Sequence, residues 1–486
     1  MPQDQDPLNI VVVGASFAGL SVAHEFLDKT ITRLHTSPAV PPYRIVLISP
    51  SSHIYWNIGA PRTIVAGNLI KESEAFVPIE PGFARHRSEE WLFVQGVCHS
   101  WDPENRDISV ESIGDIAQNR CTQLANERNS TGLGRHPAKS PVVTATPSTP
   151  SFANGIQQSI PYHALILATG TSAHSDLLSL HGPHEYTVQA IRDFQARLPL
   201  ARSIIVCGGG ASGVECAGQL ATYLNHQSLV PNWLAGQQQA NLEGLIDTPV
   251  KSITLITSTN RLLPGLNPKI SKQAERYLRS LGVTIVKDVR VMNSSTFSLT
   301  PSDERKPAAL KTRVELSDRS VMICDAYVAA TGVSPNTSYA PLNLLNSEGY
   351  IQTDVRTLRV PGAGDRVYCL GDCSSYSANY VLDVYAAVAP LMHNLGNDLI
   401  GYELWLANRY GGNDAQIEEL KRDDVIFDRK DHSGDSQLCP ITRRGGVGVL
   451  FGFVLPRFMV YFLKANDYRV HKGKAVVVDG NNPYPG

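Results

Sequence analysis

The chain has 486 residues, which is room for two to four domains at roughly 100–200 residues each. Its composition is 42% hydrophobic and its formal net charge is −2, so a large globular core fits and bulk attraction to nucleic acid is excluded. Eight cysteines in this length indicate a reducing compartment, so we expect a cytoplasmic location. The N-terminus shows no signal-peptide pattern and no glycine after Met1, so we expect neither secretion nor myristoylation.

A glycine-rich turn follows the first apolar run of the chain. Residues 10–13 (Ile-Val-Val-Val) precede Gly14-Ala15-Ser16-Phe17-Ala18-Gly19, and a helical pattern follows over residues 20–27. Strand, tight turn and helix in this order typify a dinucleotide site, because the pyrophosphate binds at the helix N-terminus. We predict that Gly14, Ser16 and Gly19 bind a dinucleotide, although Ser16 replaces the usual second glycine. The alternative is a plain turn between a buried strand and a helix.

The same pattern occurs a second time in the chain. Residues 204–207 form an apolar run before Gly208-Gly209-Gly210-Ala211-Ser212-Gly213, and a helical pattern follows over residues 214–224. We predict a second dinucleotide at Gly208, Gly210 and Gly213. Two dinucleotides in one chain indicate electron transfer between a nicotinamide and a flavin.

Three further motifs stand at the ends of apolar runs. Residues 165–170 end in Ala-Thr169-Gly170, residues 327–332 end in Ala-Thr-Gly332, and residues 367–372 end in Gly371-Asp372. An aspartate at a strand's carboxyl end can accept a hydrogen bond from a ribityl hydroxyl. Each motif alone is common, but the ordered set of five is specific.

The ordered set resembles the pyridine-nucleotide disulfide oxidoreductase superfamily, whose members carry two dinucleotide-binding domains. The resemblance covers about residues 8–394 and implies FAD at Gly14, Ser16, Gly19 and Asp372, with NAD(P)H at the second turn. It implies an α/β fold with two Rossmann-like, doubly wound parallel-sheet domains, the second inserted in the first, and a small C-terminal α+β segment. The expected boundaries are 8–195 with 336–400 for FAD, 196–335 for NAD(P)H and 401–486 for the C-terminal segment, with a disordered insertion at about 121–152.

The cysteine positions argue against a dithiol relay. Disulfide reductases of this superfamily carry a cysteine pair after the first nucleotide-binding unit, but residues 49–67 contain none. We interpret Cys369 and Cys373 as small buried hydrophobic residues. Electrons should therefore pass directly from the flavin to an external acceptor.

Residues 53–62, 213–217 and 446–467 resemble the apoptosis-inducing-factor-like branch that includes the ferroptosis-suppressor-like quinone reductases. That resemblance implies an FAD-dependent NAD(P)H oxidoreductase with a small quinone-like acceptor. Two alternatives stay open: an FAD oxidoreductase with a dedicated small substrate, and a flavin-bound signalling protein.

Three charged residues are candidates for the site itself. Glu215, just after the second turn, either holds the nicotinamide carboxamide or ribose, or lies on the helix surface. Arg62 either meets FAD phosphate or flavin charge, or is a solvated arginine. Lys464 either stabilises the N1–C2 edge of the flavin or is a surface lysine.

The second strand of each nucleotide unit ends without an acid. Ser49 stands where an acid usually binds a ribose, and it can still form a hydrogen bond. In the second unit Thr257-Ser258 stands there and Arg261 follows. Hydroxyls and an arginine would accept a 2′-phosphate, so NADPH is at least as plausible as NADH.

Residues 446–463 are apolar apart from Arg457. Arginine costs about 3 kcal/mol at a bilayer centre, and Pro456 suits the first turn of a helix. We therefore predict a strand followed by a short helix here, rather than a membrane-spanning helix. This segment either belongs to a core or dimer interface, or forms a hydrophobic surface that admits a lipid-like acceptor or contacts a membrane peripherally.

Overall fold

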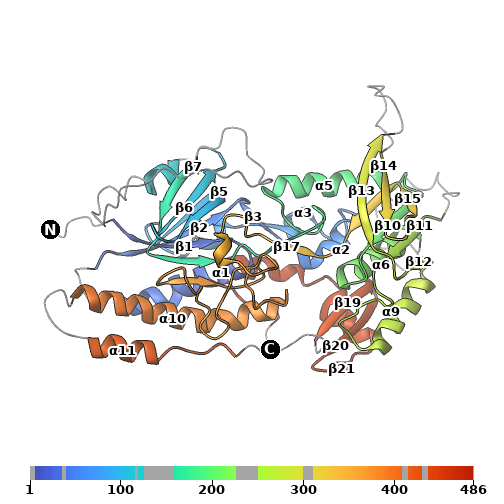
Figure 1. Cartoon of the computed structure of the whole chain (residues 1–486). Coiled ribbons are helices and arrows are strands. Elements are labelled where there is room, and N and C mark those ends of the chain that lie inside the picture. The colour runs from blue at the N-terminus through green and yellow to red at the C-terminus, as the bar shows by residue number, and fades with distance from the viewer. Residues whose placement is uncertain are drawn as a thin grey trace.

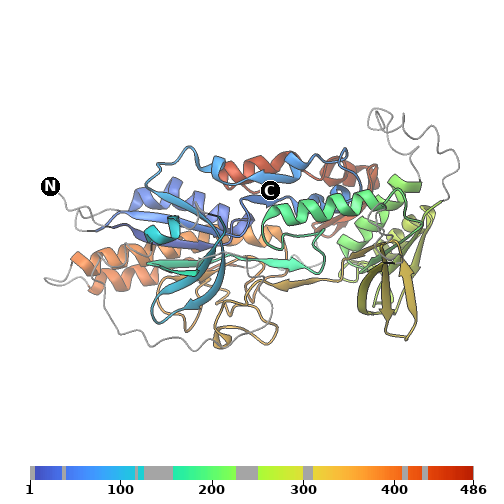
Figure 2. The ribbon, with the colours of Figure 1, turned by 90° about the horizontal axis from the view of Figure 1, so that it is seen from above.

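The computed structural model describes residues 6–34, 40–114, 119–124, 157–225, 250–298, 310–407, 414–428 and 436–484. Figure 1 shows an elongated molecule with one sheet toward each end, and Figure 2 shows it from above. Residues 125–152 of the predicted insertion lie outside the described residues. The first four residues of the predicted insertion, 121–124, contradict the prediction of disorder. Residues 119–124 are helical, and Cys121 and Leu124 are buried.

The first domain contains a seven-stranded sheet in the order β18-β8-β1-β2-β5-β6-β7. Its strands are β1 (Leu8–Val13), β2 (Tyr43–Ser49), β5 (Trp91–Asp102), β6 (Asp107–Ser112), β7 (Gln157–Pro161), β8 (Ala164–Leu167) and β18 (Val367–Cys369). The pairs among β18, β8, β1, β2 and β5 are parallel, whereas β6 and β7 are antiparallel additions. Since β18 follows the second domain in sequence, the first domain is discontinuous.

Both faces of this sheet are covered, which explains the apolar run over residues 10–13 of β1. Leu8, Ile10 and Val12 pack into the core shared with α1 (Phe17–Glu25) and α10 (Val381–Ala407). Val11 and Val13 face the opposite core. A strand buried on both sides needs apolar side chains at every position. Helix α10 continues to Ala407, so it crosses the domain boundary predicted at residue 400.

The second domain contains a parallel sheet in the order β12-β11-β10-β16. Its strands are β10 (Ser203–Cys207), β11 (Ser252–Ile256), β12 (Val283–Val286) and β16 (Ala326–Ala329). One face packs on α6 (Ala211–Asn225) and α9 (Pro268–Ser280), and the other on the antiparallel strands β13 (Val291–Ser298), β14 (Leu310–Leu316) and β15 (Val321–Cys324). The α/β class with two parallel-sheet nucleotide-binding domains is therefore confirmed.

The C-terminal segment packs against both domains. It contains β19 (Gln437–Thr442), β20 (Gly445–Leu450), β21 (Phe453–Val454), α12 (Arg457–Val460), the helical turn η8 (Tyr461–Ala465), η9 (Val470–Lys472) and α13 (Gly473–Asp479). Cys439, Ile441 and Val447 join the core of the second domain. Val476 and Val477 join the core of the first. The strand and short helix predicted for residues 446–463 are present, with Pro456 as the N-cap of α12.

Further strands and α-helices belong to the described fold. They are β3 (His53–Tyr55), α2 (Ala60–Thr63), α3 (Glu72–Ala75), β4 (Phe76–Pro78), β9 (Thr171–Ala173), α5 (His184–Arg197), β17 (Val333–Pro335) and α11 (Asp414–Arg422). Strands β9 and β17 pair where the chain passes between the two domains. Within the described residues, no helix is both long enough and apolar enough to cross a membrane.

Candidate active site

The two glycine-rich turns have the same backbone geometry. Gly14 has φ +110°, and a Cβ there would lie 2.2 Å from the carbonyl oxygen of Ala168. Gly208 has φ +121°, and its Cβ would lie 1.9 Å from the carbonyl oxygen of Ala330. Each turn therefore packs directly on an Ala-Thr-Gly strand end. From the sequence we explained these glycines by the close approach of a pyrophosphate. In the structure, the neighbouring backbone by itself excludes a side chain at both positions.

The last glycine of each turn lets the helix approach the turn. A Cβ on Gly19 would lie 1.8 Å from the carbonyl oxygen of Gly14, and one on Gly213 would lie 1.9 Å from that of Gly208. The middle positions are open instead. Ser16 is the exposed N-cap of α1 and makes no side-chain capping bond, and nothing lies within 4 Å of a Cβ on Gly210. Both helix N-termini are thus available to phosphate, so the residues present fit a dinucleotide at each turn.

The strand-end threonine and glycines lie at the crossing between the domains. Thr169 Oγ1 donates to the carbonyl oxygen of Asn336 at 2.7 Å, and Asn336 Nδ2 donates to the carbonyl oxygen of Thr169 at 3.0 Å. Gly170 and Gly332 have φ values of +64° and +119°, which place both in the left-handed region. These bonds join the first strand end to the segment that returns to the first domain, and the cofactor contacts of both motifs stay a prediction.

The Gly-Asp motif lies against the first turn. A Cβ on Gly371 would lie 3.2 Å from the Cβ of Ala18, and Asp372 Oδ1 accepts a hydrogen bond from Ser377 Oγ at 3.1 Å. Burial raises the pKa of Asp372, and the carboxylate of Asp383 adds to the rise. Asp383 is buried in the first turn of α10, and the sequence reasoning missed it. The signal available in the sequence was an acidic residue in the helix that follows the Gly-Asp motif.

The two strand ends at which the sequence predicted ribose contacts carry hydroxyl groups. Ser49 is buried, and its Oγ accepts from the backbone N–H of Ser51 at 3.2 Å. Thr257 packs beneath the second turn, since a Cβ on Gly209 would lie 2.3 Å from its Oγ1. Ser258 is exposed. Arg261 Nη2 donates to the carbonyl oxygen of Pro264 at 2.5 Å.

Glu215 and Lys464 form an ion pair although 249 residues separate them. Lys464 Nζ donates to Glu215 Oε1 at 2.9 Å and to the carbonyl oxygen of Leu438 at 3.2 Å. The side chains are 3% and 15% exposed for Glu215 and Lys464, so the surface interpretation is wrong for both. Burial raises the pKa of Glu215, which the ammonium opposes. Burial lowers the pKa of Lys464, but Glu215, together with Tyr484 and Cys439, raises it above its ordinary value.

Arg62 connects α2 to the C-terminal segment. Its Nε donates to Gln219 Oε1 at 3.0 Å, Nη1 to the carbonyl oxygen of Asn466 at 2.8 Å, and Nη2 to that of Ala465 at 2.7 Å. The guanidinium lies 4.6 Å from the ring centroid of Tyr468 and is buried. Arg62 is therefore not the solvated arginine that the sequence allowed. These bonds hold the residues next to Lys464 in place, and a contact with FAD stays a prediction.

All eight cysteines lie in described parts of the chain, and each is free and buried. The sulfur atoms of Cys369 and Cys373 are 3.7 Å apart, and both side chains are fully buried as expected. Burial raises the pKa of the Cys369 thiol, whereas the hydrogen bond from Cys369 lowers that of Cys373. Neither thiol reaches solvent in this conformation, so neither is placed to exchange with an external disulfide.

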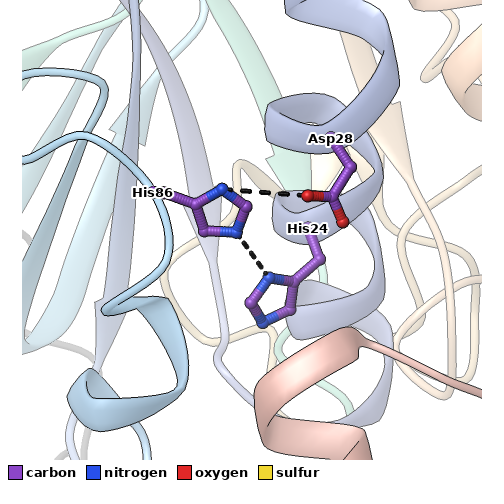
Figure 3. A group of neighbouring side chains, drawn as sticks. All are labelled: His24, Asp28 and His86. Atoms are coloured by element: carbon purple, nitrogen blue, oxygen red, sulfur yellow. Dashed lines mark hydrogen bonds and ion pairs between the residues drawn. The ribbon is translucent and has the colours of Figure 1, made fainter.

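Within the described residues, one group of three side chains has metal-ligand chemistry. Figure 3 shows His24, Asp28 and His86, whose ligand atoms lie within 4.8 Å of one another. Arg85 Nη2 donates to Asp28 Oδ2 at 2.6 Å and lies 3.4 Å from His24 Nδ1. A cation therefore already neutralises this group. Since His24 also bonds the carbonyl oxygen of Val477 at 2.8 Å, we interpret the group as a contact between α1 and α13.

Comparison with known proteins identifies the family of the region that contains both glycine-rich turns. The family model "Pyridine nucleotide-disulphide oxidoreductase" matches residues 8–390. The chain belongs to that family. It is thus an oxidoreductase that carries FAD and uses NAD(P)H, and the branch resemblance drawn from residues 53–62, 213–217 and 446–467 is supported.

Relatives match along most of the chain. "Oxidoreductase phnG" of Penicillium herquei is 30% identical over 462 residues, which cover 95% of this chain and 93% of the relative. "Ferroptosis suppressor protein 1" of Homo sapiens is 24% identical over 318 residues, covering 64% and 70%. The solved structure of NDH2 from Plasmodium falciparum in complex with NADH has a TM-score of 0.59 at 13% identity and covers 97% of this chain and 98% of NDH2. That likeness extends the shared fold to the C-terminal segment.

Proposed function

We propose that this oxidoreductase passes electrons from NAD(P)H through FAD to a small quinone-like acceptor, without a cysteine relay. The observation that carries the proposal is the buried pair Glu215–Lys464 beside the second turn, in a chain whose thiols are all buried. A dithiol relay needs a thiol that its substrate can reach. The similarity to ferroptosis suppressor protein 1 adds support, and the cysteine usage supports a cytoplasmic location.

Each part of the site has a role in this proposal. FAD, when bound, supplies the capacity to accept a hydride from a nicotinamide and to release electrons to a second molecule. The turn at Gly14 and Ser16 binds its pyrophosphate, and Asp372 binds its ribityl chain. Glu215 orients the nicotinamide, while Lys464 keeps a positive charge beside the flavin, because its pKa lies above the ordinary value. Arg62 holds the backbone next to Lys464.

An anaerobic titration tests this proposal. Purified yellow protein is mixed with NADPH or NADH, the flavin absorbance is followed, and a panel of soluble quinones is then added. We expect rapid bleaching by at least one coenzyme, followed by recovery of the flavin absorbance with quinone and multiple turnovers.

Two outcomes would contradict the proposal in different ways. Rapid bleaching without quinone turnover would favour a dedicated small substrate on the same scaffold. A protein that keeps its flavin absorbance with both coenzymes would favour a flavin-bound signalling protein.

A further inference from the structure

Large apolar side chains lie exposed on the C-terminal segment. Phe451 is 74% exposed, Phe453 and Phe462 are each 75% exposed, Phe458 is 62% exposed and Val454 is 53% exposed. These five residues, which we call the aromatic surface, come from the turn after β20, from β21 and from the consecutive helical turns α12 and η8. Figure 1 shows β20 and β21 at the lower edge of the second domain.

The segment below this surface is well packed. Val447 and Val449 of β20 and Val460 of α12 are buried, so the phenyl rings stand on the outer side of an ordered unit. Phe458 and Phe462 are four residues apart and share one side of the helical turn. A monomeric protein rarely exposes so many large apolar groups on neighbouring elements, and such a patch marks a protein or membrane contact.

The charges around the aromatic surface are positive. Residues 436–466 include Arg443, Arg444 and Arg457 but no aspartate or glutamate, whereas the whole chain has a net charge of −2. Lys464, in the same range, is paired with Glu215 and adds no charge to the surface. Arg444 and Arg457 are exposed. Helix α9, which packs against β20, exposes four further basic residues: Lys269, Lys272, Arg276 and Arg279. The acid of this helix, Glu275, is paired with Lys287 at 2.8 Å.

We propose that the aromatic surface docks on an anionic lipid bilayer, with its phenyl rings among the headgroups and its arginines toward the lipid phosphates. Exposed aromatic rings with basic side chains on neighbouring elements are the chemistry that binds such a surface. A second copy of the chain is a poorer occupant, because a two-fold contact would bring the arginines of both copies together. The docking is a property separate from the proposed electron acceptor.

Vesicle flotation with the full-length, FAD-loaded protein tests the docking. We expect binding to vesicles of phosphatidylcholine with phosphatidylserine, weaker binding to phosphatidylcholine alone, and release by salt. Phe453→Ser combined with Phe462→Ser should weaken binding about ten-fold or more, since burying each ring stabilises the complex. Arg444→Glu should weaken it about five-fold on anionic vesicles only. Leu342→Ser is the matched control, because Leu342 is 84% exposed outside the surface and should bind like wild type.

Flavin reduction by NAD(P)H, measured on the same preparations, shows that each variant is folded and loaded. Absence of wild-type binding to anionic vesicles would overturn the docking, as would equal binding by the double phenylalanine variant. A dimer seen by light scattering that the double variant abolishes, without vesicle binding, would assign the surface to a second copy and also overturn it. Failure of quinone turnover would leave vesicle binding unchanged, so the two proposals fail separately.

Discussion

The turn after β1 and the turn after β10 are alike in their backbones, whereas the helices that follow them meet the C-terminal segment differently. Ser21 and Glu215 occupy equivalent positions, two residues after the last glycine of each turn. Ser21 Oγ donates to the carbonyl oxygen of Gly480 at 2.7 Å, while Glu215 accepts from Lys464 at 2.9 Å. The same scaffold therefore carries a neutral contact in the FAD half and a buried charge pair in the nicotinamide half. The difference places the buried charge pair on the second of these helices, α6.

Replacing the first glycine of each turn with valine should distinguish the FAD site from the NAD(P)H site by the largest effect. Gly14→Val and Gly208→Val both place a branched Cβ against a backbone carbonyl at positive φ. We expect Gly14→Val to yield colourless protein, and Gly208→Val to keep FAD but lose reduction by NAD(P)H at least about a hundred-fold. Absorbance at the flavin bands and stopped-flow bleaching measure these effects.

Gly265→Ala is the control for these variants, because open space surrounds a Cβ at that position and Gly265 lies outside both turns. Circular dichroism shows which variants fold. A folded Gly14→Val protein with stoichiometric FAD would disprove the assignment of the first turn.

Breaking the Glu215–Lys464 pair should lower the free energy of unfolding more than breaking the neutral bond from Ser21 to Gly480. Removing one partner of a buried pair leaves an uncompensated charge, so Lys464→Met should lower the free energy of unfolding by about 3–5 kcal/mol. Ser21→Ala should lower it by about 1 kcal/mol. Urea unfolding measures both, and Glu215→Gln combined with Lys464→Met completes a double-mutant cycle. Strict additivity in that cycle would show that the pair contributes no coupling.

Coenzyme preference probes the hydroxyl groups at the end of β11. Arg261→Ala should lower kcat/KM for NADPH about ten- to a hundred-fold and leave NADH nearly unchanged, because an arginine–phosphate bond is worth about 1.5–3 kcal/mol. Ser258→Glu should favour NADH through repulsion of the 2′-phosphate; Ser258 is the position to change, because Thr257 is buried under Gly209. Arg279→Ala is a control on exposed α9. Equal losses with both coenzymes would make Arg261 structural.

Acid pH should weaken the contact of α1 with the C-terminal segment. Burial lowers the pKa of His24 to about 4, from 6.5 in the unfolded chain. The unfolded state then binds more protons between these values, so stability should fall by up to about 3 kcal/mol as pH drops from 6.5 to 4. Unfolding measured across this range should show a weaker pH dependence in His24→Gln. At the equivalent position α6 has Gly218, so the nicotinamide half lacks this titration.

The smallest effect is expected for the buried thiols. Cys369→Ser combined with Cys373→Ser should keep most NAD(P)H-to-acceptor activity, because neither thiol is exposed. Steady-state turnover and FAD content measure this. A specific loss of electron transfer with FAD retained would show that this pair takes part in the reaction.

The sequence by itself determined the local units. An apolar run, glycines at fixed spacing and a helical pattern specify strand, turn and helix, since each depends on neighbouring residues and backbone φ. The order of the five motifs determined the family and both cofactors. The sequence alone also showed that residues 49–67 contain no cysteine pair.

Only the tertiary structure decided what the side chains contact. Glu215 and Lys464 are paired across 249 residues, and Arg62 bonds the backbone at Ala465 across 403 residues. No local pattern encodes such distant pairs, so the sequence left each of these residues open between a role in the site and a place on the surface. The structure also decided that Gly14 is required by the backbone at Ala168, and that the phenylalanines of residues 451–462 face outward. The physical reason is that burial and pairing depend on which elements pack together, and the C-terminal segment packs on both domains.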